Sequence, residues 1–102
     1  MKMDFVLEDI ENAICEEIGV SMDDMISKTK KGACVKARHL SIYILHTEFG
    51  VSIRYLSRRY GCTVRQVFRI NNHMADYIAY SSQYKDLYTS IMSKISPSDL
   101  SS

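Results

Sequence analysis

A chain of 102 residues, with 46% apolar residues, one proline and four glycines, has the size and composition of one globular domain. This length leaves no room for a catalytic domain with accessory parts, and no apolar run approaches the roughly 20 residues that span a bilayer. The net charge of +1 is unevenly divided: residues 1–27 carry one lysine and eight acids (−7), and residues 28–69 carry ten Lys or Arg and one acid (+9).

This division of charge has two interpretations. A basic central segment is expected to face a polyanion, with the acidic segment solvating the far side of the molecule. Alternatively, the two segments match each other electrostatically within the fold. The helices predicted below indicate which of the charged residues are expected to face solvent and which are expected to face each other.

The acidic segment predicts two helices. Residues 4–18 form an amphipathic helix that Gly19 ends, and its apolar side chains at helical spacing are Phe5 or Val6, Ile10, Ile14 and Ile18. Ser21 is the expected N-cap of a short second helix, with Asp24 in the first turn, where a carboxylate suits the positive end of the helix dipole. The contacts expected from this short helix are Met22, Met25 and Ile26.

The basic segment begins with KTKKGACVKAR, residues 28–38, which has five basic residues and no acid. It is interpreted as a loop that enters a helix. That helix is expected over about residues 35–49, ends at Gly50, and buries Leu40, Tyr43 or Ile44, and Thr47. The next helix is capped by Ser52 and turns three side chains inward: Ile53, Leu56 and Tyr60.

Two further helices complete the chain. Thr63 and Gln66 form a capping-box pattern, in which each side chain accepts the backbone amide of the other residue, and the buried face that follows is Val67, Ile70 and Met74. Ser81 and Ser82 precede a last helix over residues 84–95, whose apolar residues are Leu87 or Tyr88, Ile91 and Ile95, and Pro97 stops it. With no strand signal, the chain is predicted to be one all-α domain of about six helices over residues 1–96, with a flexible tail, 97–102.

The helices on either side of Gly61 have the spacing of a helix-turn-helix. Two short helices joined by a three- or four-residue turn can pack at a steep angle only if certain positions are small, apolar or glycine. Ser57 is small where the helices would cross, and Gly61 can adopt the positive φ of the turn. The shared core is expected from Leu56, Tyr60, Cys62, Val67 and Ile70.

Polar residues on the second of these helices are expected to face outward and contact base edges: Thr63, Arg65, Gln66 and Arg69, with His73 further along the same stripe. Arginine and glutamine can make bidentate contacts to guanine and adenine in the major groove. On the first helix, three arginines would flank the groove at phosphate level: Arg54, Arg58 and Arg59. The alternative is a solvated charged face with no ligand.

Three stretches follow the order of one known family. IGVSMDDMISKTKKGACVKARHLSIYIL, residues 18–45, contains a short V-S-x-x-D-L-like helix, a basic K-S-x-K-like loop and an A-R-x-x-A-M-Y-L-like helix. VSIRYLSRRYG, residues 51–61, is similar to L-S-L-P-E-I-G-x-x-F-G, and VFRINNHM, residues 67–74, keeps the apolar register of the following helix. Over most of residues 8–95 the chain thus resembles the C-terminal DNA-binding domain of DnaA, the bacterial replication initiator.

This resemblance implies an all-helical, Trp-repressor-like fold whose helix-turn-helix enters the major groove of duplex DNA. It also implies that the basic loop reaches the minor groove or phosphates, and Arg38 matches a family arginine used on DNA. The backbone contacts expected from the basic segment are therefore Lys28, Lys30, Lys31, Lys36 and Arg38.

The family signature G-G-R-D-H-T-T-V is replaced here by GCTVRQV, residues 61–67, which is one residue shorter. The base contacts of the family are therefore not carried over, and a different DNA site is predicted. No G-x-x-x-x-G-K-[ST] occurs in the sequence, so the chain is expected to be a stand-alone domain that binds no nucleotide.

Other constellations predict no catalytic or metal chemistry. His39, His46 and His73 lack the spacing of a metal site, and no nucleophile has a base at suitable spacing, so neither an enzyme nor a cofactor is expected. His39 is expected either to touch a phosphate or to have no role. A stripe of tyrosines could stack bases, although such a stripe is more often core or a subunit interface: Tyr77, Tyr80, Tyr84 and Tyr88.

The sequence therefore predicts a duplex DNA-binding protein of the bacterial cytoplasm and nucleoid, acting in the regulation of replication or transcription. Cys15, Cys34 and Cys62 are odd in number and form no C-x-x-C pair, which is typical of reduced thiols in a cytosol. The alternative is a protein-interaction module that keeps the scaffold and binds a protein partner through its acidic first helix or its tyrosine stripe. Neither hypothesis includes a membrane partner.

Overall fold

The computed structural model describes residues 2–27 and 29–95, with the backbone alone for residues 2–6. In this part of the chain it contains α1 (Lys2–Ile18), α2 (Met22–Ile26), α3 (Gly32–Phe49), α4 (Ile53–Arg59), α5 (Val64–Tyr80) and α6 (Ser82–Ile95), and no strand. The predicted all-α class is confirmed. The predicted tail and the side chains of Phe5 and Val6 lie outside the described residues, and the domain boundary at residue 96 stays a prediction.

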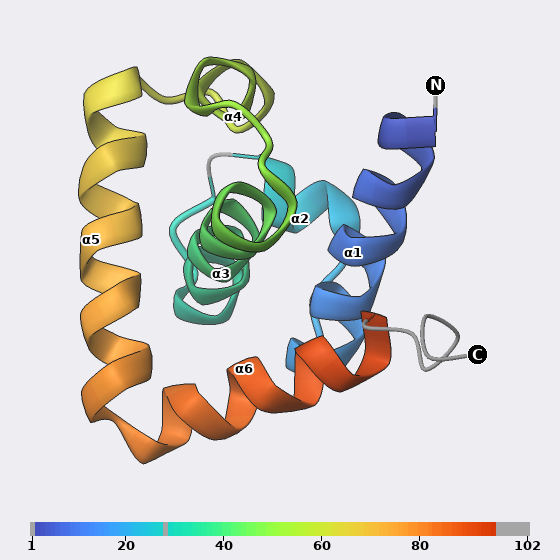
Figure 1. Ribbon diagram of the computed structural model, residues 1–102. Coiled ribbons are helices and arrows are strands. Elements are labelled where there is room, and N and C mark those ends of the chain that lie inside the picture. The colour runs from blue at the N-terminus through green and yellow to red at the C-terminus, as the bar shows by residue number, and fades with distance from the viewer. Residues whose placement is uncertain (1, 28, 96–102) are drawn as a thin grey trace.

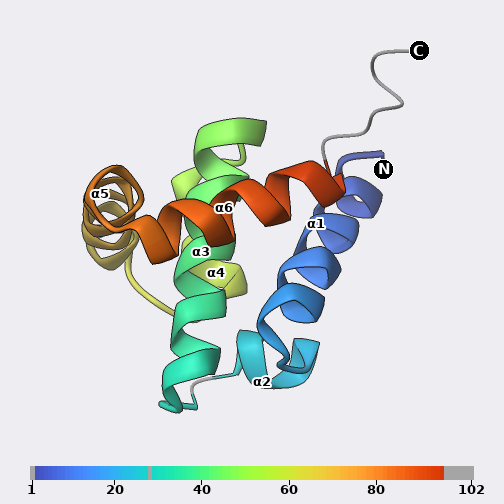
Figure 2. The same cartoon turned by 90° about the horizontal axis from the view of Figure 1, so that it is seen from below.

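The helices surround α3, which is seen nearly along its axis in Figure 1. Helix α5 runs along one side of it and α1 along the opposite side, while α6 leads from the end of α5 back to α1. Figure 2 shows the same arrangement from below, with α5 seen end-on and α6 crossing the molecule to α1. Helix α4 packs mainly on α5 and also on α3, and the α4–α5 pair forms one corner of the molecule (Figure 1).

The central position of α3 explains why it is apolar on more than one side. Its fully buried residues include Leu40, Ile42, Ile44 and Leu45, which point in different directions around the helix. Of the two expected alternatives, Ile44 is fully buried and Tyr43 is partly exposed. Thr47 was expected to be buried and is exposed, although Phe49, two residues further along α3, packs against the core, so Thr47 lies on a side of α3 that none of the other described helices covers.

The helix boundaries follow local chemistry. The side-chain oxygens of Ser21 and Ser52 accept backbone amides at the starts of α2 and α4, as predicted. Gly50 ends α3 with a φ of 71°, which side chains rarely tolerate, and its amide bonds back to the last turn. Three starts differ from the predictions: α1 begins at Lys2, α3 at Gly32 and α6 at Ser82, which is two, three and two residues earlier than expected. At α6 the Ser81 hydroxyl accepts the Tyr84 amide at 3.4 Å, so Ser81 caps the helix and Ser82 is its first residue.

A buried polar cluster joins α1 to α4. Glu11 is fully buried, and its carboxylate accepts two bonds from the Arg59 guanidinium, Nε to Oε2 and Nη2 to Oε1, both at 2.6 Å. The Tyr60 hydroxyl also donates to Glu11 and lies 2.5 Å from the Ser41 hydroxyl. Burial, followed by the nearby carboxylate, raises the pKa of Tyr60 well above its ordinary value. Because both charges are paired and bonded, the cluster is stable only as a unit.

Candidate nucleic-acid interface

The helix-turn-helix consists of α4, a turn over residues 60–63 and α5. Gly61 has a φ of 65°, and the turn is closed by the Cys62 amide, which donates to the Ser57 carbonyl at 2.9 Å. Ser57 is buried where the helices cross, and its hydroxyl donates to the Arg54 carbonyl at 2.8 Å. The expected shared core is present: Leu56, Tyr60 and Val67 are buried, while Cys62 and Ile70 are partly buried against them.

The start of α5 is held by the predicted capping box. The Thr63 hydroxyl accepts the Gln66 amide at 3.0 Å, and the Gln66 side-chain oxygen accepts the Thr63 amide at 2.8 Å. A glutamine that reads adenine in bidentate fashion needs both its oxygen and its nitrogen. Since the Gln66 oxygen is already used, this residue can read adenine in that way only if the capping box opens.

Over the first three turns of α5, the outward face consists of Arg65, Phe68, Arg69 and Asn72, with Val64 at its edge, and all five are exposed. At about 100° per residue the first four point away from Val67 and Met74, which are 0% and 1% exposed, whereas Val64 lies about 60° from Val67. Arg65 and Arg69 were predicted to face outward, and the structure exposes both. Gln66 and His73 are also exposed but lie on the flank of this face, and Thr63 precedes it.

Sequence reasoning missed Val64, Phe68 and Asn72. Phe68 is 54% exposed and Val64 is 40% exposed, although both are apolar. The available signal was angular, because Phe68 and Asn72 lie far from the direction shared by Val67, Ile70 and Met74.

The three arginines of α4 have different positions. Arg54 and Arg58 are exposed, as the predicted phosphate contacts require. Arg59 is turned inward, with its side chain 22% exposed and paired to Glu11. This corrects its predicted position beside the groove: the buried carboxylate of α1 holds the guanidinium, and this bond raises the pKa of Arg59 above its ordinary value. Arg59 therefore serves the fold.

The basic segment, residues 28–38, also contains both exposed cations and one that is bonded within the fold. Lys30 and Lys31 are exposed, whereas Lys28 lies outside the described residues. The Arg38 guanidinium donates to the carbonyls of Met25, Ser27 and Thr29 at 2.7–2.9 Å. Two of its nitrogens, Nε and Nη2, thus hold the end of α2 and the loop. The predicted phosphate contact of Arg38 would have to use its remaining nitrogen.

Lys36, which is part of the basic segment 28–38, and His39 both lie on α3. Lys36 places its ammonium 5.3 Å from the centre of the Tyr84 ring, so part of its charge faces an aromatic ring of α6. His39 is partly buried, and this burial, followed by the positive charges of Arg38 and His73, lowers its pKa below the ordinary value. The lowered pKa disfavours the charged imidazolium, and whether His39 touches a phosphate stays a prediction.

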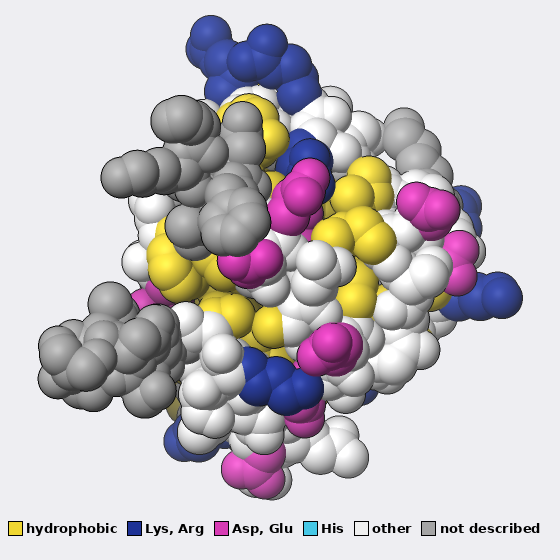
Figure 3. Space-filling model, turned by 90° about the vertical axis from the view of Figure 1, so that its right-hand side faces the viewer, with side chains coloured by type: hydrophobic (Ala, Val, Ile, Leu, Met, Phe, Trp, Pro, Cys, Tyr) yellow, Lys and Arg dark blue, Asp and Glu magenta, His cyan; other side chains and the backbone are white. Residues whose placement is uncertain are grey.

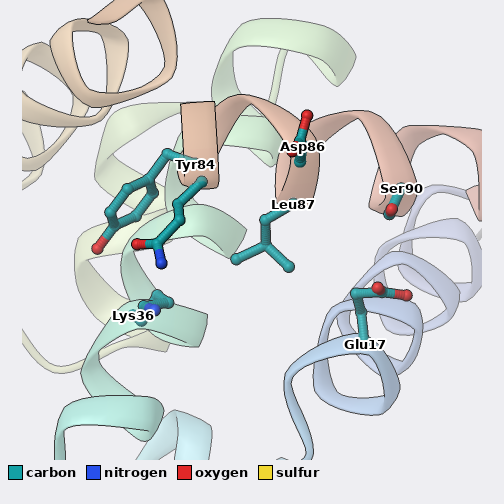
Figure 4. A pocket seen from close by; sticks show the side chains of 7 residues that line it. Glu17, Lys36, Tyr84, Asp86, Leu87 and Ser90 are labelled. Carbon is teal, nitrogen blue, oxygen red and sulfur yellow. The ribbon is translucent and has the colours of Figure 1, made fainter. Parts of the chain in front are cut away.

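A hollow of about 290 Å³ lies between α3, α6 and the end of α1 (Figure 4). Glu17 and Asp86 line it together with Lys36, so acids outnumber bases. Two carboxylates disfavour a phosphate there. Among the described residues, no group of three or more His, Cys, Asp or Glu side chains is arranged to hold a metal ion.

The side of the molecule opposite α5 carries the acidic helix. Glu8, Asp9 and Glu16 of α1 are exposed, and Figure 3 shows Asp and Glu side chains spread over this side together with Lys, Arg, apolar and uncharged ones. The second interpretation of the charge division is met at one point, where Glu11 neutralises Arg59 inside the fold, and the polyanion interpretation stays a prediction.

The tyrosine stripe is divided between core and surface. Tyr84 and Tyr88 are partly buried against the core, and the Tyr88 hydroxyl donates to Glu48. The Tyr77 ring stacks on Tyr84 with centres 5.0 Å apart, and Tyr80 is 87% exposed. The exposed tyrosines lie at the far end of α5 from Arg65. In the described part of the chain, no helix has the length and apolarity needed to cross a bilayer.

Comparisons with known proteins agree with this geometry. A family model described as "Bacterial dnaA protein helix-turn-helix" matches residues 7–67. A chromosomal replication initiator protein DnaA of Leptospira biflexa is 26% identical over 83 residues, and that of Pseudothermotoga lettingae is 36% identical over 47 residues. The alignments cover 81% and 46% of this chain but 19% and 11% of those proteins, so the chain spans about a fifth of their length or less.

Proposed function

The chain belongs to the family of the bacterial DnaA protein helix-turn-helix, and we propose that it binds duplex DNA by placing the first turns of α5 in the major groove. The observation that carries this proposal is the outward face of α5. It has two arginines and no acid over its first three turns, and the packed helix-turn-helix keeps it rigid. A rigid element of this kind positions base contacts more precisely than a loop does.

Base reading falls to the outward face. Arg65 and Arg69 each have the planar donor pair that matches the O6 and N7 acceptors of guanine. Asn72, one turn further on, has the donor and acceptor that match adenine. Thr63 and Gln66 remain predicted base contacts at the start of the helix, where both are exposed, with Gln66 limited to its amide nitrogen while the capping box is closed.

Backbone anchoring falls to exposed cations on α4 and immediately before α3. Arg54 and Arg58 lie on α4, and Lys30 and Lys31 lie immediately before α3. No side chain caps the start of α3, so its first amides are available to a phosphate beside these two lysines. Lys28 and Lys36 remain predicted contacts from the same basic segment, and Arg59 is no longer one of them.

The named relatives are replication initiators, and the chain matches only a small part of each. We propose that this chain acts in the regulation of replication or transcription by occupying DNA, without catalysis and without nucleotide. The site that it reads differs from that of the family, since GCTVRQV stands in place of the signature at residues 61–67. A location in the bacterial cytoplasm, on the nucleoid, follows from this role.

The test is a fluorescence titration of random duplex at several salt concentrations, followed by selection of bound sites from a random duplex pool. If roughly five phosphates are neutralised, log affinity falls with log salt at a slope of about −4 to −5. A slope near zero would refute duplex binding. Selection then supplies the site, and a pool that shows no enrichment after several rounds would refute sequence-specific reading.

A second candidate function rests on the opposite end of α5. Tyr77 and Tyr80 are 47% and 87% exposed there, and exposed tyrosines are common in protein interfaces. A protein-interaction module would bind a partner through this end or through the acidic face of α1. Replacing Arg65 and Arg69 by alanine distinguishes the two functions, because it weakens DNA binding and leaves such a partner bound.

A further inference from the structure

Phe68 is an apolar side chain in an unusual position. It is 54% exposed on α5, and Val64, one turn earlier on the same side of the helix, is 40% exposed. The apolar side chains that pack against the core include Val67, Ile70 and Ile78 of α5, but in the described part of the chain Phe68 is not among them. The fold therefore gains little from Phe68, while its ring faces water.

The neighbours of Phe68 indicate what could cover it. Arg65 and Arg69 lie beside it on the outward face of α5, and Asn72 lies one turn further on. These polar residues can contact base edges, so on the proposed function the Phe68 ring would enter the major groove with them. A peptide partner would have to be acidic as well as apolar to cover Phe68 beside two guanidinium groups, whereas DNA supplies both properties without further assumption.

The major groove presents one apolar group on its base edges, the C5 methyl of thymine, and phenylalanine is among the side chains that contact it. We propose that Phe68, with Val64 beside it, reads thymine methyl groups, and that these thymines lie next to the bases contacted by Arg65 and Arg69. This inference rests on the proposed function and adds the class of base that this face selects.

The spacing along the helix gives two such contacts. Val64 and Phe68 are four residues apart, a rise of about 6 Å, which is close to two base steps of about 3.4 Å each. One methyl group cannot serve both side chains. The proposal therefore predicts two thymines in the selected site, of which the one facing the larger and more exposed Phe68 has the greater effect.

The experiment replaces thymines by uracil, one at a time, in the duplex selected from the random pool. Uracil lacks only the C5 methyl and keeps every hydrogen-bonding group. Covering one methyl group contributes roughly 0.8 kcal/mol, which corresponds to an affinity loss of about four-fold at the thymine that faces Phe68. If no uracil position weakens binding by the unchanged protein, the inference is overturned without any variant.

The variant Phe68→Ala assigns the effect to this side chain. It should bind the selected duplex more weakly and should bind the thymine and uracil versions equally at that position. Phe68→Leu keeps an apolar contact and should retain part of the discrimination. Tyr80→Ala removes an even more exposed aromatic ring from the far end of α5 and should keep the full four-fold effect. Circular dichroism of each variant checks that the helices remain folded.

Failure of this inference is distinguishable from failure of the proposed function. If the unchanged protein binds no duplex in a salt-dependent manner, the proposed function itself fails. If it binds the selected duplex and Phe68→Ala retains the same uracil effect as the unchanged protein, only the assignment to Phe68 fails, and another side chain reads the methyl group.

Discussion

The outward face of α5 and the buried cluster around Glu11 both depend on arginine, and they use it differently. Arg65 and Arg69 are exposed with no acid near them on the first turns of α5. Arg59 is bound in bidentate fashion to a fully buried carboxylate. The comparison teaches that a basic segment is not one surface: some of its cations stabilise the scaffold, and the scaffold then positions the others.

The largest expected effect is on stability, from Arg59→Ala. Removing the guanidinium leaves the Glu11 carboxylate buried without its cation, which costs about 3–5 kcal/mol of unfolding free energy. Urea unfolding followed by circular dichroism measures it. The matched control is Arg58→Ala, the preceding exposed residue, for which a change within about 0.5 kcal/mol is expected. Equal losses in the two variants would contradict the separation of inward and outward arginines.

The next effect is on DNA affinity, from the Arg65→Ala, Arg69→Ala double variant. Each base-contacting arginine contributes about 1–3 kcal/mol to specific binding, so affinity of the double variant for the selected duplex should fall by about 25-fold or more. Unfolding free energy should be unchanged, since both side chains are exposed. Lys85→Ala removes an exposed cation from α6 as the control. If the double variant keeps full affinity and sequence preference, α5 is not the reading helix.

Arg38, in the basic segment 28–38, is a second arginine that stabilises the fold through its hydrogen bonds. Arg38→Ala removes three bonds to the carbonyls of Met25, Ser27 and Thr29, and the partial exposure of this site limits the expected loss to about 1–2 kcal/mol. The loop should also become easier to cleave, which limited trypsin digestion after Lys30 and Lys31 measures. Unchanged stability together with a lower salt slope for DNA binding would instead place Arg38 among the phosphate contacts.

The smallest expected effect is from single phosphate contacts. Arg54→Ala or Arg58→Ala should reduce the magnitude of the salt slope by about 1, which is the contribution of one phosphate contact, and should weaken binding to all duplexes equally. Titration of selected and scrambled duplexes at several salt concentrations measures both quantities. A change in sequence preference would show that these arginines contact bases rather than phosphates.

The sequence alone predicted the helix caps and the glycine of the turn. The caps at Ser21, Ser52 and Thr63 and the positive φ of Gly61 follow from short-range rules, and the structure confirms each of them. The helix-turn-helix core also followed from spacing, because its residues lie close together in the sequence. The outward positions of Phe68 and Asn72 required the direction of the core as well as the helical period.

The all-α class, the helix-turn-helix and the excess of positive charge over residues 28–69 follow from the sequence alone. Which of those charges reach the surface depends on how the helices pack. Arg59 and Glu11 are 48 residues apart and meet because α1 and α4 both pack on α3. The reason is physical: a charge and a helical period are local properties, whereas the partner that neutralises a charge is set by packing between distant helices.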